Sequence, residues 1–261
     1  MPAPDGAQAV RRALQLLQGF GEAGSSASVT DLARRSGLTL STTHRLLKVL
    51  AAEGFLTQDP DTARYQLGPA VIELGRLAYR RRALQRAEPE LADLALRTGA
   101  TADLALRWGA YAVIVSGGSV EHDQPGGLRR PLHSTALGKV LLAWSPDEER
   151  LDELGPLEPL TSRTITDPAS LADELARVRE QGYAVNDGES ALGVRTIAVP
   201  VRDAAGRARF ALALRSSPTA MPTARLGWFV DQATACAAAL EVLLIPPAQR
   251  RAQSGRAAGS A

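Results

Sequence analysis

A polar, basic face and an apolar stripe share residues 41–50, which are expected to form a helix. Leu46, Leu47 and Leu50 recur, together with Thr43, at the spacing of one buried helix face. The other side carries hydroxyl, imidazole and cationic groups in its first two turns: Ser41, Thr42, His44, Arg45 and Lys48. In helix-turn-helix proteins, this part of the second helix meets the base edges of DNA. The segment is therefore a candidate recognition helix for double-stranded DNA.

These side chains suit different contacts with DNA. Arg45 has the paired donors that recognise guanine, whereas Ser41 and Thr42 are short enough to touch phosphates or bases. Lys48, one turn further on, and Arg64, on an expected strand, are better suited to phosphate contacts. The alternative is that all of them are ordinary solvated residues of a small helical domain.

The surrounding elements favour DNA binding. Thr30 is the expected N-cap of a preceding helix, and Gly37 is its expected left-handed C′ residue. Gly54 ends the second helix, and two short strands are expected on either side of the Asp-Pro-Asp turn at 59–61. The pattern predicts a winged helix-turn-helix domain over residues 1–68, a unit whose main use is DNA binding.

Two further helices are expected to flank this domain. The first covers residues 7–20 and is expected to pack on the helix-turn-helix and to offer a dimerisation face. Its apolar side is formed by Val10, Leu14, Leu17 and Phe20. The second begins at Pro69, a first-turn position that suits proline, and runs toward Glu88, where Pro89 interrupts it. Residues 69–86 are therefore the expected linker.

Charge divides the chain in the same way. Residues 1–86 carry 12 Lys/Arg against 7 Asp/Glu, whereas residues 87–249 carry 15 against 21. The basic part coincides with the predicted DNA-binding domain, as phosphate binding requires. The acidic part would be repelled by DNA, and it therefore needs another function. At 261 residues the chain is long enough for one small and one medium domain.

The pattern of residues 87–245 is that of an α+β domain on a mainly antiparallel sheet. Strands are expected on both sides of Gly109 and along 183–186, 196–202 and 209–215, the last two joined by a hairpin turn at 203–206. The expected helices are 89–98, 147–154, 168–181 and 222–244.

Several classes of protein are disfavoured by what the sequence lacks. The single cysteine, Cys236, excludes a disulfide framework or a cysteine-based metal cluster, and its alanine-rich surroundings favour a buried role. We expect no metal and no cofactor. No signal segment and no apolar run of membrane-spanning length is apparent, so the protein is expected to be cytoplasmic, without a membrane partner. Residues 246–261 are expected to be a disordered tail.

Three motifs resemble the IclR (isocitrate lyase regulator) family of bacterial transcription factors. They are SGLTLSTTHRLLKVLAAEGFL with RYQLG, RRPLHSTALGKVLLA, and VREQGYAVNDGESALGVRTIAVPVRDAAG. The resemblance covers about residues 8 to 245. It implies a winged helix-turn-helix, a linker helix and a GAF-like effector-binding domain. It also implies a homo-oligomer, a dimer or tetramer, that binds a DNA operator.

The segment after Pro131 is a candidate effector site. Ser134 or Thr135 can cap the helix that follows, leaving first-turn backbone N–H groups able to attract a carboxylate. The resemblance implies that the amides of Ala136 and Leu137, next to Gly138, hold the carboxylate of a small-molecule effector. The alternative is a routine helix start whose N–H groups bind water.

Four later positions align with the other side of the family's pocket, and all depart from its usual acidic, cysteine and hydroxyl residues: Asn186, Thr196, Ala213 and Arg215. Asn186 and Thr196 retain hydrogen-bonding groups, whereas Ala213 does not. An inward Arg215 would bind a carboxylate or phosphate with paired donors, but an outward Arg215 would be plain strand surface. These departures leave open a larger acid as effector, or the loss of effector binding.

Other functions are less well supported. His133, Lys139 and Glu189 could suggest an enzyme, but His133 is expected to pack or bind backbone, and Lys139 to hold a loop or pair with an acid. No serine has a nucleophile-elbow setting, and no group of residues has metal-ligand spacing. The protein is therefore not expected to be an enzyme. The remaining rival is a DNA-binding architectural protein whose second domain only oligomerises.

Overall fold

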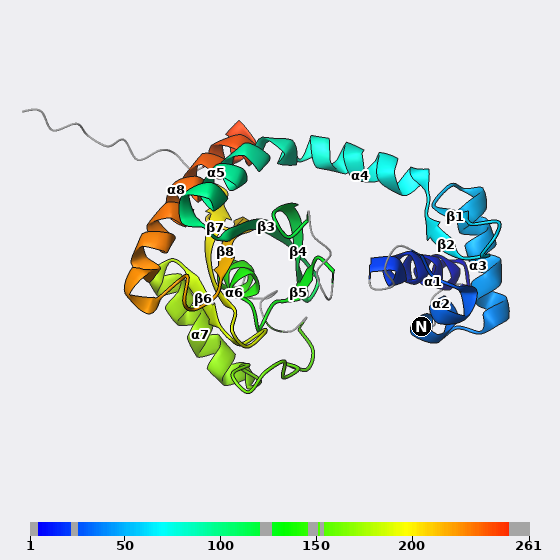
Figure 1. Ribbon diagram of the computed structural model, residues 1–261, viewed down its shortest axis with the longest axis horizontal. Helices are drawn as coiled ribbons and strands as arrows, with labels where there is room; N and C mark the ends of the chain where they lie inside the picture. The colour runs from blue at the N-terminus through cyan, green and yellow to red at the C-terminus, as the bar shows by residue number, and fades with distance from the viewer. Residues whose placement is uncertain (1–4, 22–25, 121–126, 146–150, 152–153, 251–261) are drawn as a thin grey trace, which may run out of the picture. The chain divides into compact units, whose positions relative to one another are not determined.

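The computed structural model describes residues 5–21, 26–120, 127–145, 151 and 154–250 (Figure 1). The chain folds into two compact units. The first is built mainly from Met1–Arg82 and the second mainly from the chain from Ala83 onward.

The first unit is a winged helix-turn-helix. Its elements are α1 (Asp5–Gln18), a 3-10 turn (Gly19–Gly21), α2 (Val29–Ser36), α3 (Leu40–Ala52), β1 (Leu56–Gln58), β2 (Tyr65–Leu67) and α4 (Pro69–Arg81). The antiparallel strands β1 and β2 form the wing. Ala27, just before α2, forms an additional bridge to Tyr65, which was not predicted. This bridge ties the start of the helix-turn-helix to the wing.

The caps of α2 confirm its predicted end and correct its predicted start. Gly37 ends α2 at a φ of 65°, in the left-handed region that glycine tolerates. The predicted N-cap was wrong by two residues: Ser28 caps α2 by accepting a hydrogen bond from the Asp31 N–H, and Thr30 lies inside the helix. Two hydroxyl residues stand near this helix start, and the upstream one takes the extended conformation that a cap needs.

The predicted apolar face of α1 was wrong in part. Leu16 and Phe20 are buried in the core of the first unit, with Leu17 partly buried against it. Val10 and Leu14 are 60% and 52% exposed. The helix therefore has two apolar sides, of which one packs inside the unit and the other lies on its surface.

Helix α4 ends earlier than predicted. It stops at Arg81, and Ala83 then takes a left-handed conformation with a φ of 55° before a 3-10 turn (Leu84–Arg86). Pro89 does not break this helix but lies in the first turn of the next one, α5 (Glu88–Thr98). No residue of α4 is buried.

The second unit has a six-stranded, entirely antiparallel sheet in the order β5-β4-β3-β8-β7-β6. Its strands are β3 (Thr101–Trp108), β4 (Tyr111–Gly117), β5 (Arg129–Pro131), β6 (Ala184–Asp187), β7 (Arg195–Arg202) and β8 (Ala208–Ser216). Its other helices are α6 (Ala136–Ala143), α7 (Pro168–Gln181) and α8 (Leu226–Leu244), with 3-10 turns at Thr223–Arg225 and Pro247–Gln249. The predicted α+β class and antiparallel sheet are confirmed.

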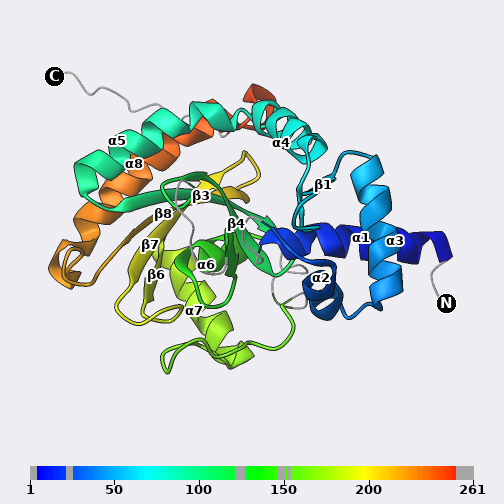
Figure 2. The same cartoon turned by 45° about the vertical axis from the view of Figure 1, so that its right-hand side comes forward.

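The sheet curls around α6, as Figures 1 and 2 both show. Helices α5 and α8 lie side by side on the outer face of the sheet, while α6 packs on the inner face and α7 packs against α6. Ala198 and Ala213 are buried where α6 approaches β7 and β8. Their small side chains let the helix lie close to the strands, which brings its N-terminus to the sheet.

The edges of this unit differ in part from the predictions. The predicted helix 147–154 falls mostly outside the described residues. The last helix begins with a 3-10 turn rather than at Pro222. The predicted disordered tail begins too early, since Pro247–Gln249 are helical and the Gln249 carbonyl accepts from the Ala204 N–H at 2.7 Å.

Helix α8 also corrects the expectation about apolar runs. Among the described residues, Thr223–Leu244 is long and apolar enough to cross a membrane, with 22 residues and a mean hydropathy of 1.2. One side of this helix packs on β7 and α5, and it includes buried Phe229, Cys236 and Leu240. Burial raises the pKa of the Cys236 thiol to about 12, which agrees with the predicted apolar role.

Candidate functional site

The candidate DNA-binding face lies on α3. Thr43, Leu46, Leu47 and Leu50 are buried, as predicted, and the opposite side is left exposed. Ser41, His44, Arg45 and Lys48 are all exposed. Thr42 is half-buried, and its hydroxyl accepts a hydrogen bond from the Thr39 hydroxyl at the helix cap. The structure thus places four of the five predicted side chains where they can contact a duplex.

Arg64 has a partner inside the first unit. Its guanidinium donates to the hydroxyl and the carbonyl of Ser26, each at 2.8 Å. These bonds fasten the wing to the segment before α2 and fix the direction of the side chain. A guanidinium has five N–H groups, so others remain for a phosphate.

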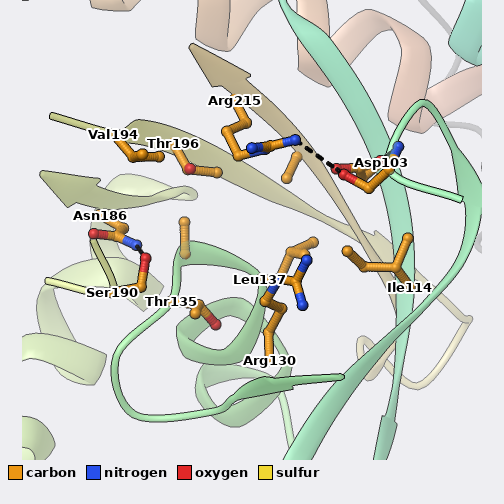
Figure 3. A pocket seen from close by; sticks show the side chains of 13 residues that line it. Asp103, Ile114, Arg130, Thr135, Leu137, Asn186, Ser190, Val194, Thr196 and Arg215 are labelled. Atoms are coloured by element: carbon orange, nitrogen blue, oxygen red, sulfur yellow. Dashed lines mark hydrogen bonds between the residues drawn. The ribbon is translucent and has the colours of Figure 1, made fainter. Parts of the chain in front are cut away.

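The second unit contains a pocket between the N-terminus of α6 and the inner face of the sheet (Figure 3). It encloses about 410 Å³ of space, part of it open to solvent. Strand register explains which side chains meet there. Asn186, Thr196 and Arg215 are direct neighbours across β6, β7 and β8, so their side chains share one face. Ala213 lies two positions along β8 and therefore on the same face.

Helix α6 supplies backbone donors to this pocket. Thr135 is its N-cap and accepts from the Gly138 N–H at 3.1 Å, while its own hydroxyl donates to the Pro131 carbonyl. Ala136 and Leu137 line the pocket, and no acceptor for their N–H groups lies within the described parts of the chain. First-turn amides of this kind attract anions.

Gly138 has a different role from its two neighbours. It does not line the pocket, and its N–H group is already taken by Thr135. A Cβ atom on Gly138 would lie 2.2 Å from the Leu132 carbonyl oxygen. The structure therefore places Gly138 where the chain before α6 crosses close to the helix.

The polar positions on β6 and β7 also differ from each other. The Asn186 side chain holds the loop that follows β6: it accepts from the Glu189 N–H at 2.8 Å and donates to the Ser190 hydroxyl at 2.6 Å. Thr196 lines the pocket, and its side chain makes no hydrogen bond with the described residues. Ser190 and Val194, from the same loop, line the pocket and were not predicted.

The orientation of Arg215, which the sequence left open, is toward the pocket (Figure 3). Its guanidinium donates to the Ser119 hydroxyl at 3.2 Å. Ser119 in turn donates to Asp103 through its hydroxyl at 2.6 Å and its backbone N–H at 2.8 Å. Asp103 and Ser119 are buried and were missed from the sequence, because only the pairing of β3 with β4 and β8 brings them to Arg215.

Arg130 on β5 is a second basic residue that the sequence did not reveal as part of this pocket. Its guanidinium donates to the neighbouring Arg129 carbonyl at 2.9 Å. Burial lowers the pKa of Arg130, and the nearby positive charge of Arg215 lowers it further to a smaller extent. The negative charge of Asp103 partly offsets this lowering. The two guanidinium groups therefore repel one another in the pocket.

A buried ion cluster joins α6 to α7 and to the loop after β6. Lys139 on α6 is 1% exposed, and its ammonium group lies 2.6 Å from Glu189 and 3.0 Å from Glu174. It also donates to the Val185 carbonyl at 3.2 Å. Burial raises the pKa of Glu189, although Lys139 opposes that shift. The expected pairing of Lys139 with an acid is confirmed, and it fastens α6 to the loop after β6.

The candidate enzymatic groups have structural roles. The His133 ring makes a 3.0 Å hydrogen bond with the Glu158 carbonyl, as expected for a residue that binds backbone. No group of three or more His, Cys, Asp or Glu residues that could hold a metal was found in the described ranges. The first-turn amides of α6 and the guanidinium groups that line the pocket suit it to binding an anion.

Comparisons with known proteins agree for both units. A family model described as the bacterial transcriptional regulator IclR C-terminal domain matches residues 78–242, and one for the IclR helix-turn-helix domain matches residues 9–60. The chain is 35% identical over 250 residues to the HTH-type transcriptional regulator XynR of Escherichia coli (strain K12), covering 92% of this chain and 98% of that protein. It is 34% identical over 229 residues to the HTH-type transcriptional repressor AllR of Escherichia coli (strain K12), covering 85% and 84%.

A solved structure has the same architecture. It is an IclR homologue complexed with 4-hydroxybenzoate, from Microbacterium hydrocarbonoxydans, with a TM-score of 0.74 and 25% identity. The similarity covers 90% of this chain and 98% of that one.

Proposed function

The chain belongs to the IclR family of bacterial transcriptional regulators, and from this membership we propose that it is a ligand-responsive repressor. In this proposal, a cytoplasmic homo-oligomer binds an operator through α3 and the wing. A small organic acid in the pocket of the second unit changes its affinity for that operator. The ligand acts only to the extent that it binds one quaternary state better than the other.

The exposed polar face of α3 is the observation that carries the DNA-binding part of the proposal. Its apolar side is held in the core, so the helix cannot turn this face inward without losing that packing. Ser41, His44 and Arg45 stand in the first two turns, where a recognition helix meets bases. Lys48 and Arg64 are proposed to contact phosphates.

The amides of Ala136 and Leu137 support the effector part of the proposal. They stand at a capped helix start in a pocket lined by Thr196, Ala213 and Arg215. The similar protein whose title names 4-hydroxybenzoate, a carboxylated molecule, supports the same chemistry. No catalytic role is proposed for the pocket, since the relatives of this protein are transcriptional regulators.

Unburied apolar residues support a homo-oligomer. Leu74 and Leu77 on α4 are 53% and 44% exposed, and Val10 and Leu14 on α1 are more than half exposed. A second copy of the chain packed against these side chains would remove their apolar surface from water, which favours association. Dimeric helix-turn-helix proteins bind two half-sites separated by about one helical turn of DNA or a multiple of it. A palindromic or repeated operator is therefore proposed.

Replacing Arg45 with alanine tests the base-contact assignment. The variant is expected to bind its operator more weakly by about 1–3 kcal/mol, because a paired contact with a base is lost. The loss should be confined to specific DNA, as measured by gel-shift titration against operator and random duplexes. Lys48→Ala is the matched control from the same helix: it should weaken binding to both duplexes alike and flatten the salt dependence. Equal operator affinity of wild type and Arg45→Ala would refute the assignment.

The effector part is tested by a thermal-shift screen with carboxylic acids. We expect stabilisation of the full-length protein by at least one acid, since a ligand that binds the folded state raises its stability. Silence across a broad panel would favour the architectural rival, in which the second unit only oligomerises. Hydrolysis of model esters above a buffer blank would instead favour an enzyme.

A further inference from the structure

A polar groove lies between α1 and α3 in the first unit, and we call it the α1–α3 groove. The two helices pack against each other, and the groove encloses about 680 Å³ of space, part of it open to solvent. Both helices contribute to its walls, which are formed by Gln8, Ala9, Arg12, Thr42, Arg45 and Leu46. Among the described residues, this lining includes two arginines and no acidic side chain. Walls of this charge favour an anionic partner.

The two arginines of the groove have no partner within the described chain. Neither Arg12 nor Arg45 makes a hydrogen bond or an ion pair with another described residue, and the same is true of the Gln8 side chain. A guanidinium group has five N–H donors and stays charged, so these donors are available to an external anion. Arg12 is also half-buried, so it has less conformational freedom to lose when it binds.

The α1–α3 groove adjoins the exposed polar face of α3. Thr42, Arg45 and Leu46 share one side of the helix through their spacing of three and four residues, while Ser41 and His44 lie further around it. Arg45 therefore stands at the edge between the groove and the polar face. When the first turns of a recognition helix enter the DNA major groove, the sugar-phosphate chain that borders it passes beside them. The side of α3 that faces α1 is thus placed next to a DNA strand.

We propose that the α1–α3 groove binds the sugar-phosphate backbone of DNA, with Arg12 and Gln8 donating to a phosphate. This rests on the proposed DNA binding through α3 and adds α1 to that interface. Gln8 and Arg12, four residues apart, lie on one flank of buried Leu16, whereas exposed Val10 and Leu14 lie on the other flank. The DNA contact and the proposed contact between two copies of the chain therefore use different sides of α1.

The test is the salt dependence of DNA binding by the full-length protein. Fluorescence anisotropy measures the affinity for a labelled duplex of mixed sequence between about 50 and 200 mM salt. Each neutralised phosphate contributes about 0.9 to the slope of log K against log salt. Arg12→Gln should lower the magnitude of this slope by about 0.9 for each chain bound and weaken binding by on the order of tenfold at the lowest salt. Arg12→Lys should retain most of the slope, since an ammonium group also binds phosphate.

Arg11→Gln is the matched control for the loss of charge. Arg11 is the neighbouring residue on α1, is exposed and lies outside the groove, so it should change the slope less than Arg12→Gln does. Gln8→Glu is a second variant, which places an anion in the groove and should also weaken binding. Its control is Ala7→Glu, at an exposed position outside the groove. Melting curves establish that each variant folds, and the second pair decides if Arg12→Gln does not fold.

A second duplex separates phosphate contacts from base contacts. This duplex is one that the wild type selects from a random-sequence library. Arg12→Gln should weaken binding to the selected and the mixed-sequence duplex by the same factor, whereas Arg45→Ala should affect mainly the selected one.

The outcomes distinguish this inference from the proposed function. If Arg12→Gln matches Arg11→Gln in affinity and slope, or Gln8→Glu matches Ala7→Glu, the α1–α3 groove is not a phosphate site, and DNA binding through α3 still stands. Weakening by Arg12→Gln on the selected duplex alone would also overturn the phosphate assignment. Failure of the wild type to bind either duplex would remove the proposed function and the inference together.

Discussion

Replacing Lys139 with methionine is expected to lower the free energy of unfolding of the second unit by about 3–5 kcal/mol near neutral pH. Methionine fills a similar volume but leaves Glu189, a largely buried carboxylate, without its 2.6 Å ammonium partner. Glu174, which keeps Arg177 at 3.0 Å, is less affected. Urea unfolding followed by a probe of the second unit measures the change, since two units need not unfold together.

The same variant should show a characteristic pH dependence. Burial raises the folded-state pKa of Glu189 above its value of 4.5 in the unfolded chain, and loss of Lys139 removes an influence that lowers it. A carboxyl group with a raised pKa contributes stability below its unfolded pKa, and this contribution is lost as pH rises through the folded pKa. The deficit of Lys139→Met should therefore be largest at neutral pH and shrink as the pH falls toward and below 4.5.

Glu189→Gln is the matched control for this prediction. It removes one charge but leaves Lys139 with Glu174 and the Val185 carbonyl, so a clearly smaller loss is expected. Equal losses for the two variants, or a deficit that does not change with pH, would show that the ammonium group does not neutralise a buried carboxylate.

The double variant Leu74→Asp/Leu77→Asp is expected to be monomeric and to bind a palindromic operator on the order of 100-fold or more weakly. Both side chains lie exposed on α4, a helix without a buried residue. If a second copy covers them, each leucine contributes about 1.5–3 kcal/mol of apolar burial, which an aspartate would forfeit while placing a charge in the contact. Light scattering after size exclusion measures the mass, and gel shift measures the affinity.

Arg76→Asp controls for the charge introduced on α4. Arg76 is exposed on the same helix. It shares a helix face with Glu73 and Arg80, and Leu74 lies on the opposite face. This control should retain the oligomer. A double variant that keeps both the mass and the operator affinity of the wild type would remove α4 from the interface.

Local patterns were enough to predict most of the helix-turn-helix. The buried stripe of α3 and the left-handed Gly37 depend on spacing and backbone conformation within a few residues. The exposed side of α3 follows from the same periodicity. The errors were local as well: two hydroxyl residues competed for one cap, and α1 had apolar residues on two sides.

The pocket required the tertiary structure. Motif and resemblance predicted Ala136, Thr196 and Arg215, and all three line it. The direction of Arg215 was undecided because a one-residue change of register reverses the face of every side chain on a strand. The observed pairing of Arg215 with Thr196 settles it.

Asp103, Ser119 and Arg130 gave no signal in the sequence, because each is an ordinary polar residue in its local segment. The order β5-β4-β3-β8 and the curl of the sheet bring them to Arg215, from which Ser119 is separated by 96 positions. The sequence alone determined the family, most of the helices and the exposed polar face of α3, since these depend on short-range periodicity and recognisable motifs. The tertiary structure decided the charge of the pocket, because that charge depends on long-range strand pairing.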